Sequence, residues 1–272
     1  MILKKKKPTT SSQRHFISLN NAELEKKPFL KNKIKGLKTA SGTNNSGKIV
    51  SRRKGGGNKT RYRKIQFDRS TYSVGIVVTK EYDPYRSSNI CSIYDFIKKK
   101  YYYIIAPSNL DIGNIIKSGK TVDIYNGNSL PLSKIPVGSL IHNISTKTTK
   151  KAELSRSAGT FSQIIEKTPT TVRLVLSSGE QRYISANCFV TLGTVSNESW
   201  FLTTVGKAGR SRWLNKRPKV RGVAMNPIDH PHGGGEGKTS GGRTSVTPWG
   251  KPTRNRKTSN SKNKLRILKI NG

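Results

Sequence analysis

The positive charge of this chain is so unevenly distributed that we expect an ordinary folded core only in its middle half. The 272 residues carry 52 Lys and Arg against 14 Asp and Glu, a formal net charge of +38. Residues 1–64 have a net charge of +17 and residues 206–272 have +15, whereas residues 65–205 have +6. Because like charges oppose compaction, we expect the two ends to be neutralised by a polyanion.

The segment Arg217–Thr253 is cationic, crowded with Gly and Pro, and poor in large aliphatic residues after Ile228. It cannot bury enough apolar surface to fold alone. Glycines let a backbone approach phosphates closely, and prolines reduce the ordering cost on binding. Trp213 and Trp249 lie among basic residues and can stack on unpaired bases. The segment therefore favours a nucleic-acid-binding extension, with a solvated charged tail as the alternative.

The middle of the chain predicts a mainly β fold. From Tyr72 to about Val205, short β-branched and apolar runs alternate with turns, which is typical of small barrels or a sandwich. Turn residues cluster at 127–136 and suggest a boundary there. The expected domains are a basic N-terminal extension at 1–70, a barrel at 71–130, a second barrel at 131–205 and a basic Gly/Pro-rich extension at 206–272.

Alternation and turn signals also place individual elements. The hairpin around Ser177–Gly179 is the best signalled, because apolar and β-branched residues flank the turn on both sides. We expect a short helix near Leu202–Gly206. The expected strands are Ser73–Lys80, Asn89–Phe96, Lys100–Ala106, Thr121–Tyr125, Ser139–Ser145, Phe161–Lys167, Thr171–Leu176, Gln181–Ala186 and Val190–Val195.

Several other classes of protein are disfavoured. The two cysteines, Cys91 and Cys188, lie far apart, which excludes a disulfide framework or a zinc ribbon and predicts two small buried side chains. No run approaches the ~20 apolar residues of a membrane span. The first 20 residues are basic and rich in Ser and Thr, as transit peptides are, but the block Lys4–Lys7 favours a functional arm.

Two segments resemble a nucleotide-binding loop and a metal site but lack features that such sites require. The stretch Gly233–Thr239 resembles a phosphate-binding loop, but the required first glycine falls on His232, and prolines and glycines flank the motif instead of a strand and a helix. Asp229, His230 and His232 lack the rigid setting of a three-ligand metal site. We therefore expect no nucleotide-hydrolysing loop and no metal site in this segment.

The chain resembles a known family at residues that occur in the family's order. VRGVAMNPIDHPHGGGEG (Val220–Gly237) and VTPWGKPT (Val246–Thr253) closely resemble the universal large-subunit ribosomal protein two family. The further matching blocks are GKIVSRRKGGGNK (Gly47–Lys59), EYDPYRSSNI (Glu81–Ile90), YIIAP (Tyr103–Pro107), SLPLSKIPVGSLIHN (Ser129–Asn143), LSRSAGT (Leu154–Thr160) and GKAGRSRW (Gly206–Trp213).

The resemblance implies an OB-like barrel, then an SH3-like barrel, with long extensions embedded in large-subunit rRNA. Arg86 and Arg156 fall on the family's RNA-binding arginines, and Asp229 and His230 fall in the motif that reaches toward the peptidyl-transferase region. It further implies neighbouring ribosomal proteins, a small-subunit contact across the intersubunit side, support of subunit association, no membrane, and no cofactor apart from structural Mg²⁺ of the rRNA. Because the catalyst of this family's particle is RNA, the resemblance also implies no catalytic residue and no enzyme activity.

These arguments give one set of candidate RNA-binding residues, drawn from the two extensions and the two barrel arginines. The set is Arg52, Arg53, Lys54, Lys59, Arg61, Arg63, Arg86, Arg156, Arg210, Arg212, Trp213, Arg217, Arg221, His230, His232, Lys238, Arg243, Trp249 and Lys251. A ribosome assembly factor or RNA-directed enzyme that uses Asp229 and His230 is the alternative. A general cationic packager of nucleic acid is a third possibility, and it would bind DNA and RNA equally.

The chain departs from the family pattern at a few positions. Asn58 replaces a usual histidine, and Tyr94–Tyr103 lacks the usual Gly-centred turn. The first residues resemble the α-proteobacterial and mitochondrial branch, and Lys, Asn, Ile and Tyr are plentiful. These features favour a mitochondrial ribosome, with a plastid or the bacterial cytoplasm as the alternative.

Overall fold

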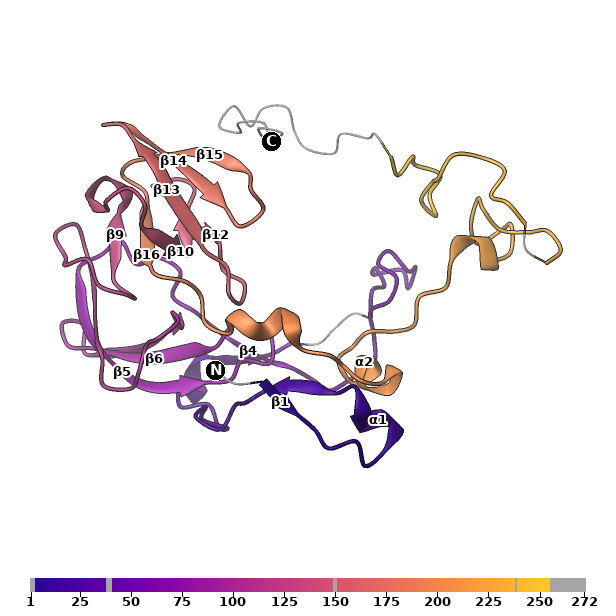
Figure 1. The fold of residues 1–272 in the computed structure, drawn as a ribbon, viewed down its shortest axis with the longest axis horizontal. Helices are drawn as coiled ribbons and strands as arrows, with labels where there is room; N and C mark the ends of the chain where they lie inside the picture. The colour runs from indigo at the N-terminus through magenta and orange to yellow at the C-terminus, as the bar shows by residue number, and fades with distance from the viewer. Residues whose placement is uncertain (1–2, 38–40, 149–150, 238, 255–272) are drawn as a thin grey trace. The chain divides into compact units, whose positions relative to one another are not determined.

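The computed structural model describes residues 3–37, 41–148, 151–237 and 239–254 (Figure 1). Two compact units are distinguished within the chain. As far as they are described, the first comprises Met1–Lys38 and Lys59–Lys207, and the second comprises Thr39–Asn58 and Ala208–Lys264. The N-terminal 70 residues thus contribute to both units.

The first barrel is built from four antiparallel strands, and two of them alternate buried and less buried residues, as strands with one interior face do. These strands are β5 (Ser73–Glu81), β6 (Ile90–Asp95), β7 (Lys100–Ile105) and β8 (Ile115–Ser118). β5 pairs with both β6 and β8, and β6 pairs with β7. The buried core consists of Val77, Cys91, Ile93, Ile104, Ala106, Leu110 and Ile116.

The second barrel contains six strands around a larger core. The strands are β9 (Ser129–Pro131), β10 (Leu140–His142), β13 (Ser162–Lys167), β14 (Thr171–Leu176), β15 (Gln181–Ser185) and β16 (Phe189–Leu192). Its thirteen fully or nearly buried residues include Ile144, Val172, Leu174 and Cys188. The β14–β15 hairpin confirms the best sequence signal, since Gly179 takes a φ of 76° that glycine adopts without strain.

A single parallel pair, Ser118 with Ser129, joins β8 to β9 and makes the two barrels one ten-stranded sheet. Arg69 reinforces this junction from inside. Its guanidinium is buried and donates to Ser118 Oγ at 2.9 Å and to the Gly127 carbonyl at 2.9 Å. A buried charge with several hydrogen bonds fixes the barrels to each other, because leaving any bond unmade is costly.

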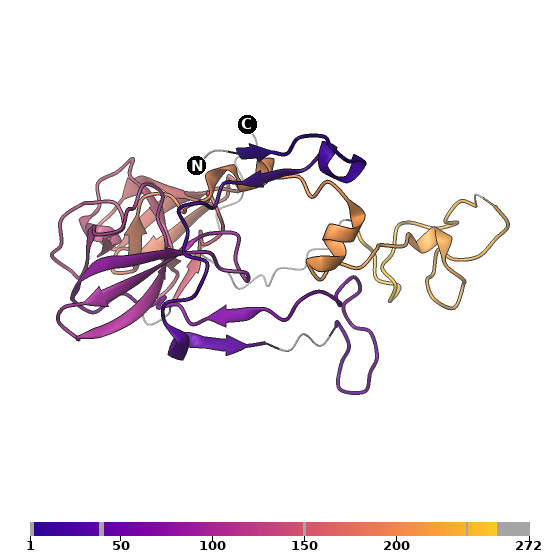
Figure 2. The same cartoon turned by 90° about the horizontal axis from the view of Figure 1, so that it is seen from below.

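Part of the N-terminal extension is integrated into the first unit. Two short antiparallel ladders join β1 (Leu3–Lys5) to β2 (Ile17–Leu19) and β3 (Ile34–Gly36) to β4 (Arg61–Arg63) (Figure 2). A third apolar cluster then packs Leu30 and Ile65 against Ile90, Tyr103, Ile105 and Val195.

A buried carboxylate secures that contact. Glu81 accepts hydrogen bonds from the Phe29 N–H at 3.0 Å and the Tyr103 hydroxyl at 2.9 Å. The same hydroxyl accepts from the Leu30 N–H at 2.9 Å. Burial, reinforced by Glu81, raises the pKa of Tyr103.

Several shorter elements complete the first unit. They are α1 (Ser11–Arg14), three 3₁₀ helices (Lys31–Lys33, Leu132–Lys134 and Glu198–Leu202) and the two-stranded ladder of β11 (Ile144–Ser145) with β12 (Ala152–Leu154).

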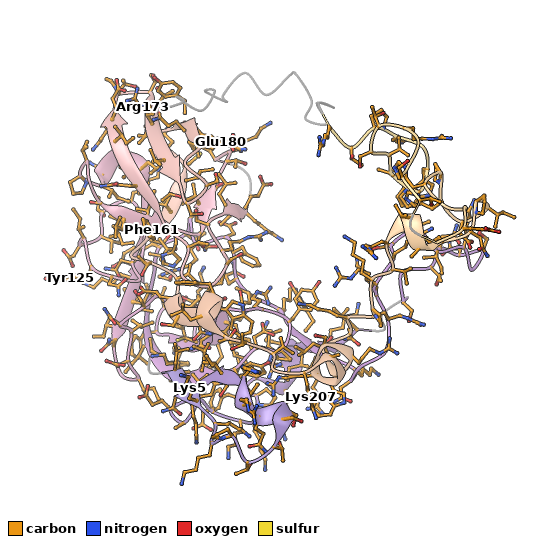
Figure 3. All side chains as sticks on the ribbon, turned by 45° about the vertical axis from the view of Figure 1, so that its right-hand side comes forward. Lys5, Tyr125, Phe161, Arg173, Glu180 and Lys207 are labelled. Atoms are coloured by element: carbon orange, nitrogen blue, oxygen red, sulfur yellow. The ribbon has the colours of Figure 1, made fainter. Side chains whose placement is uncertain are left out.

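Acidic side chains of the first unit are used in local ion pairs. Arg173 pairs with Glu166 at 3.3 Å, and Arg182 pairs with Glu180 at 3.0 Å. Arg173 and Glu180 both lie at the β14–β15 end of the second barrel (Figure 3). Exposed pairs of this kind stabilise a fold by only about 0–1 kcal/mol each, so the barrels depend on their apolar cores.

The mainly β prediction is confirmed, but some elements differ. No strand forms at Thr121–Tyr125, where turn bonds link Tyr125 N to Asp123 O and Asn128 N to Tyr125 O. Asn143, with a φ of 52°, divides the expected strand Ser139–Ser145 into β10 and β11. The helix expected at Leu202–Gly206 is replaced by the 3₁₀ helix Glu198–Leu202 and by α2 (Ala208–Trp213).

The second unit has little regular structure. It contains α2, the 3₁₀ helix Gly222–Ala224 and isolated bridges such as Lys54 with Lys216. Among its described residues only Gly55 and His230 are buried. The low apolar burial expected for Arg217–Thr253 is therefore observed. Across the described residues, no helix has the length and apolar character that a bilayer crossing requires.

Candidate nucleic-acid interface

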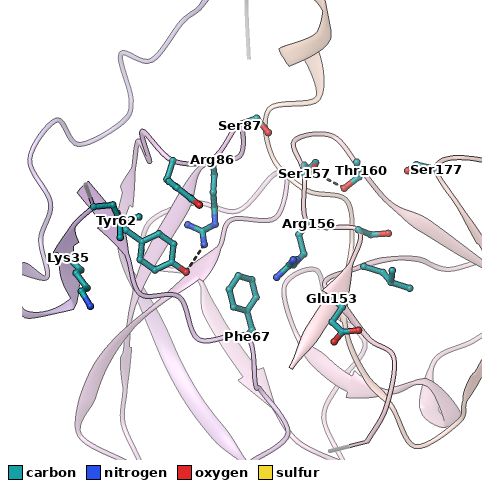
Figure 4. A pocket seen from close by; sticks show the side chains of 14 residues that line it. Lys35, Tyr62, Phe67, Arg86, Ser87, Glu153, Arg156, Ser157, Thr160 and Ser177 are labelled. Carbon is teal, nitrogen blue, oxygen red and sulfur yellow. Dashed lines mark hydrogen bonds between the residues drawn. The ribbon is translucent and has the colours of Figure 1, made fainter. Parts of the chain in front are cut away.

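A groove of about 910 Å³ lies within the first unit, between segments of both barrels (Figure 4). Its basic and aromatic side chains come from distant parts of the chain: Lys35 from β3, Tyr62 from β4, Phe67 from the following segment, Tyr85 and Arg86 from the β5–β6 loop, and Arg156 from the loop after β12. Hydroxyl groups of Ser87, Ser157, Thr160 and Ser177 complete the lining, together with Glu153.

Arg86 is held firmly at one side of the groove. Its Nη1 donates to Asp83 Oδ2 at 2.8 Å, and its Nη2 donates to the Tyr62 hydroxyl at 3.4 Å. Its Cζ lies 5.2 Å from the centre of the Tyr62 ring. The Asp83 carboxylate also accepts the Tyr85 N–H, so the loop that carries Arg86 is fixed by its own side chains.

Arg156 lies across the groove and is held differently. Its Cζ is 4.9 Å from the centre of the Phe67 ring, whereas no hydrogen bond or ion pair to another described residue is formed. The preceding residue, Ser155, has a φ of 50° and its carbonyl accepts the Asn143 N–H at 2.9 Å. The loop is therefore fixed while the guanidinium donors of Arg156 are available to an incoming anion.

The two arginine loops are also joined to each other. The Ala158 N–H donates to Ser87 Oγ at 3.3 Å, and Asn197 Nδ2 donates to the Ser87 carbonyl at 2.7 Å. The structure thus brings together Arg86 and Arg156, two of the predicted RNA-binding residues, on the walls of one groove. Planar guanidinium groups and aromatic rings are the chemistry that binds phosphate and bases.

The remaining candidates in the first unit are distributed outside the groove. Lys59 and Arg61 are exposed at β4 and beside it, where they can reach a polyanion. Arg63 is only 5% exposed, and its Nη1 donates to the Arg61 carbonyl at 3.2 Å. Arg63 therefore does not present its guanidinium at the surface of the unit.

The second unit carries most of the other candidates. Trp213 and Trp249 are about 60% exposed, at 62% and 60%. Arg52 donates to the Asp229 carbonyl at 3.2 Å and thereby joins two of its segments. The further candidates in this unit are Arg53, Lys54, Arg210, Arg212, Arg217, Arg221, Arg243 and Lys251. Lys238 lies outside the described residues.

His230 and His232 form a stacked pair within the second unit, with ring centres 5.2 Å apart. His230 Nδ1 accepts the His232 N–H at 3.0 Å, so a neutral His230 ring carries its proton on Nε2. His232 Nε2 accepts the Val246 N–H at 3.0 Å. Burial, His232 and Arg52 together lower the pKa of His230.

The described contacts do not join Asp229 to His230 as an acid–base pair. Asp229 is exposed, and its carbonyl rather than its carboxylate is engaged, by Arg52. Nδ1 of His230 is already used as an acceptor within its own turn. Among the described residues, no group of three or more His, Cys, Asp or Glu side chains is arranged to hold a metal ion.

Sequence reasoning gave no functional role to Tyr62, Phe67 or Tyr85. All three rings nevertheless line the groove. For two of these rings the signal is an aromatic residue next to arginine, as in Tyr62 between Arg61 and Arg63 and Tyr85 before Arg86, whereas Phe67 has no arginine beside it in the sequence. Such pairs are common in folded proteins, so the signal becomes specific only when the fold places them together.

Comparison with known proteins agrees with the motifs in the sequence. Residues 30–118 match the family model described as Ribosomal Proteins L2, RNA binding N-terminal domain, and residues 125–250 match the Ribosomal Proteins L2, C-terminal domain.

Curated relatives match over nearly the whole chain. The Large ribosomal subunit protein uL2 of Parvibaculum lavamentivorans is 47% identical over 259 residues, 95% of this chain and 93% of the relative. That of Bartonella bacilliformis is 47% identical over 263 residues, 96% of this chain and 95% of the relative. That of Afipia carboxidovorans is 44% identical over 271 residues, 99% and 97% of the two chains. With both family models matched in order and these identities across its length, the chain belongs to the ribosomal protein L2 (uL2) family.

Proposed function

We propose that this chain is a structural, rRNA-binding protein of the large ribosomal subunit. The observation that carries the proposal is the match to uL2 relatives over about 95% of the chain. The family model named for RNA binding spans residues 30–118, which include Arg86 and the three aromatic residues of the groove. The net charge of +38 supplies the electrostatic attraction that such a role requires.

The two units contribute to binding in different ways. The first unit brings a prefolded groove, in which Arg86 and Arg156 contact phosphate and the exposed Tyr85 ring can stack on an unpaired base. The second unit, with its low burial, becomes ordered against RNA. Because each neutralised phosphate releases counterions, the affinity falls steeply as salt rises.

Within the ribosome, we place Asp229 and His230 near the peptidyl-transferase region and assign the chain a supporting role in subunit association. Neighbouring ribosomal proteins and a small-subunit contact are its further partners. The support for these finer assignments is the motif Val220–Gly237. No cofactor of its own is proposed, and Mg²⁺ would belong to the rRNA.

The proposed location is the mitochondrial ribosome, and the bacterial cytoplasm or a plastid is the alternative. Relatives from Parvibaculum and Bartonella support the α-proteobacterial branch from which this choice follows. The abundance of Lys, Asn, Ile and Tyr is typical of an AT-rich organelle genome.

The contacts of Asp229 and His230 do not favour the alternative function, an RNA-directed enzyme or an assembly factor. The exposed Asp229 does not orient the His230 ring, whose Nδ1 is occupied by the His232 N–H. Turnover by the purified protein in the absence of rRNA would favour the enzyme over the structural role.

Sedimentation of a lysate through a gradient tests the proposed function. Mass spectrometry should find the chain in the mature large-subunit peak, and ribonuclease treatment should remove it from that peak. A chain found only among free or precursor particles would contradict the structural role and favour an assembly factor.

A further inference from the structure

The Phe67 side chain lies between the two arginines of the groove. The Cζ atom of Arg156 is 4.9 Å from the centre of the Phe67 ring, and that of Arg86 is 5.7 Å from it (Figure 4). The ring is itself anchored, because it packs against the apolar cluster that contains Leu30 and Tyr103. A rigid aromatic surface therefore supports two guanidinium groups that belong to different barrels.

The two arginines depend on this ring to different degrees. Arg86 has further partners in Asp83, Tyr62 and Tyr85, and its guanidinium would keep its place without Phe67. Among the described residues, the Arg156 guanidinium has a single side-chain partner, the ring of Phe67. A long, exposed arginine without such a contact has several rotamers and loses that freedom when it binds phosphate.

We propose that Phe67 is a positioning residue of the RNA interface: its ring holds the Arg156 guanidinium in the groove, at a fixed distance from Arg86, in the orientation that binds an RNA phosphate. Phe67 acts through Arg156 and contributes no charge of its own. The inference rests on the proposed function, because it presupposes that the groove binds rRNA.

Because of the loop contact between Ala158 and Ser87, Phe67 positions only the side chain of Arg156 and not its backbone. That hydrogen bond, at 3.3 Å, already fixes the backbones that carry Arg156 and Arg86 relative to each other. What remains to be set is the direction of the Arg156 side chain, and a ring beneath the guanidinium sets it by a cation–π contact. Loss of the ring would therefore release the Arg156 guanidinium from the orientation that binds phosphate. The spacing of the two loops would stay intact.

A double-mutant cycle on the full chain tests the proposal, with its large-subunit rRNA, transcribed and folded with Mg²⁺, as the binding partner. Phe67→Leu should weaken binding roughly fivefold, within the range that cation–π contacts account for. Arg156→Ala should weaken it by roughly tenfold or more. The double variant should bind like Arg156→Ala alone, because Phe67 has nothing to position once the arginine is absent.

The salt dependence separates positioning from a general structural loss. Arg156→Ala should reduce the slope of log affinity against log salt by about one, since one phosphate contact is lost. Phe67→Leu should leave the slope unchanged while lowering the affinity at every salt concentration. Phe67→Tyr, which keeps the ring, should bind like the unaltered chain, and so should Phe96→Leu, a leucine substitution of an exposed ring outside the groove.

Independent losses from Phe67→Leu and Arg156→Ala that add in the double variant would overturn the positioning role, as would unaltered binding by Phe67→Leu. If Arg86→Ala and Arg156→Ala each left both affinity and salt slope unchanged, the groove itself would not be an RNA interface. That second result would reject the assignment of the groove and not merely the role of Phe67.

Discussion

The barrels and the second unit obtain their structure from different sources. The first unit contains three apolar clusters, and residues such as Leu174 and Ile144 are fully buried in them. In the second unit, Gly55 and His230 are the only buried residues among those described. The hydrophobic effect can therefore stabilise the barrels in isolation, whereas the second unit relies on turns, local hydrogen bonds and a polyanionic partner.

The largest expected effect is the loss of RNA affinity when the residues after Lys207 are removed from the chain. A chain that ends at Lys207 lacks sixteen Lys and Arg but retains both barrel cores. At about 0.2 M salt its affinity for the rRNA should fall by about a thousandfold, with a smaller salt slope, because several phosphate contacts are lost. Filter binding over a salt series measures this. An unchanged slope would show that the part of the second unit after Lys207 contributes no phosphate contacts.

The free energy of unfolding should depend more on the barrels than on the second unit. Leu174→Ala removes buried apolar groups and leaves a cavity, so it should lower the free energy of unfolding by about 2–5 kcal/mol. Trp249→Ala, in the second unit, removes a side chain that is 60% exposed and should change it by less than about 0.5 kcal/mol. Urea unfolding followed by circular dichroism compares the two. A comparable loss from Trp249→Ala would mean that the second unit shares in the folded core.

Acid should destabilise the barrels through His142. Its pKa is lowered to about 4, mainly by burial, which the bond to the Gly193 carbonyl opposes and the nearby Arg69 reinforces. The unfolded state therefore binds more protons between about pH 6.5 and 4, so stability is complete above that range and lost as pH falls through it. The loss reaches about 3 kcal/mol.

Unfolding free energies measured across this pH range test the role of His142. His142→Gln, which retains a polar side chain without titrating there, should show a smaller decrease between pH 6.5 and 4. An identical decrease in both proteins would assign the acid sensitivity to other groups.

Replacing His232 should change stability only locally, because its ring forms hydrogen bonds within the second unit. Its ring accepts the Val246 N–H at 3.0 Å and lies 3.4 Å from the Gly241 carbonyl. In the chain bound to its rRNA, His232→Ala should lower the local opening free energy at Val246 by about 1 kcal/mol and leave the barrels unaffected. Amide hydrogen exchange at Val246 measures this, and a change at Leu174 instead would contradict the separation of the two units.

Sequence patterns predicted the barrels better than the groove. Alternating β-branched residues predicted β14 at its observed bounds, Thr171–Leu176, and the adjoining hairpin. Strands of three or four residues, such as β8 and β9, are too short for a clear alternation and were not predicted. Thr121–Tyr125 has the composition of a strand, yet turn bonds within Asp123–Asn128 shape it instead.

The candidate site depends on contacts between distant residues. The family motifs predicted Arg86 and Arg156 separately, 70 positions apart, but no pattern predicted that Phe67 lies between their side chains. Charge alone also did not distinguish the buried Arg63 from the exposed Arg61. The two residues share a face of β4, and they differ in their neighbours, since Arg63 is paired with Ile34 and Arg61 with Gly36.

Hydrogen exchange on the whole chain, free and bound to its large-subunit rRNA, tests the central claim most directly. Amides of β13–β15 should be protected in both states, and amides of residues 217–253 should gain protection only with RNA. Equal protection of residues 217–253 in the free chain would contradict the claim, because the second unit would then fold without a polyanionic partner.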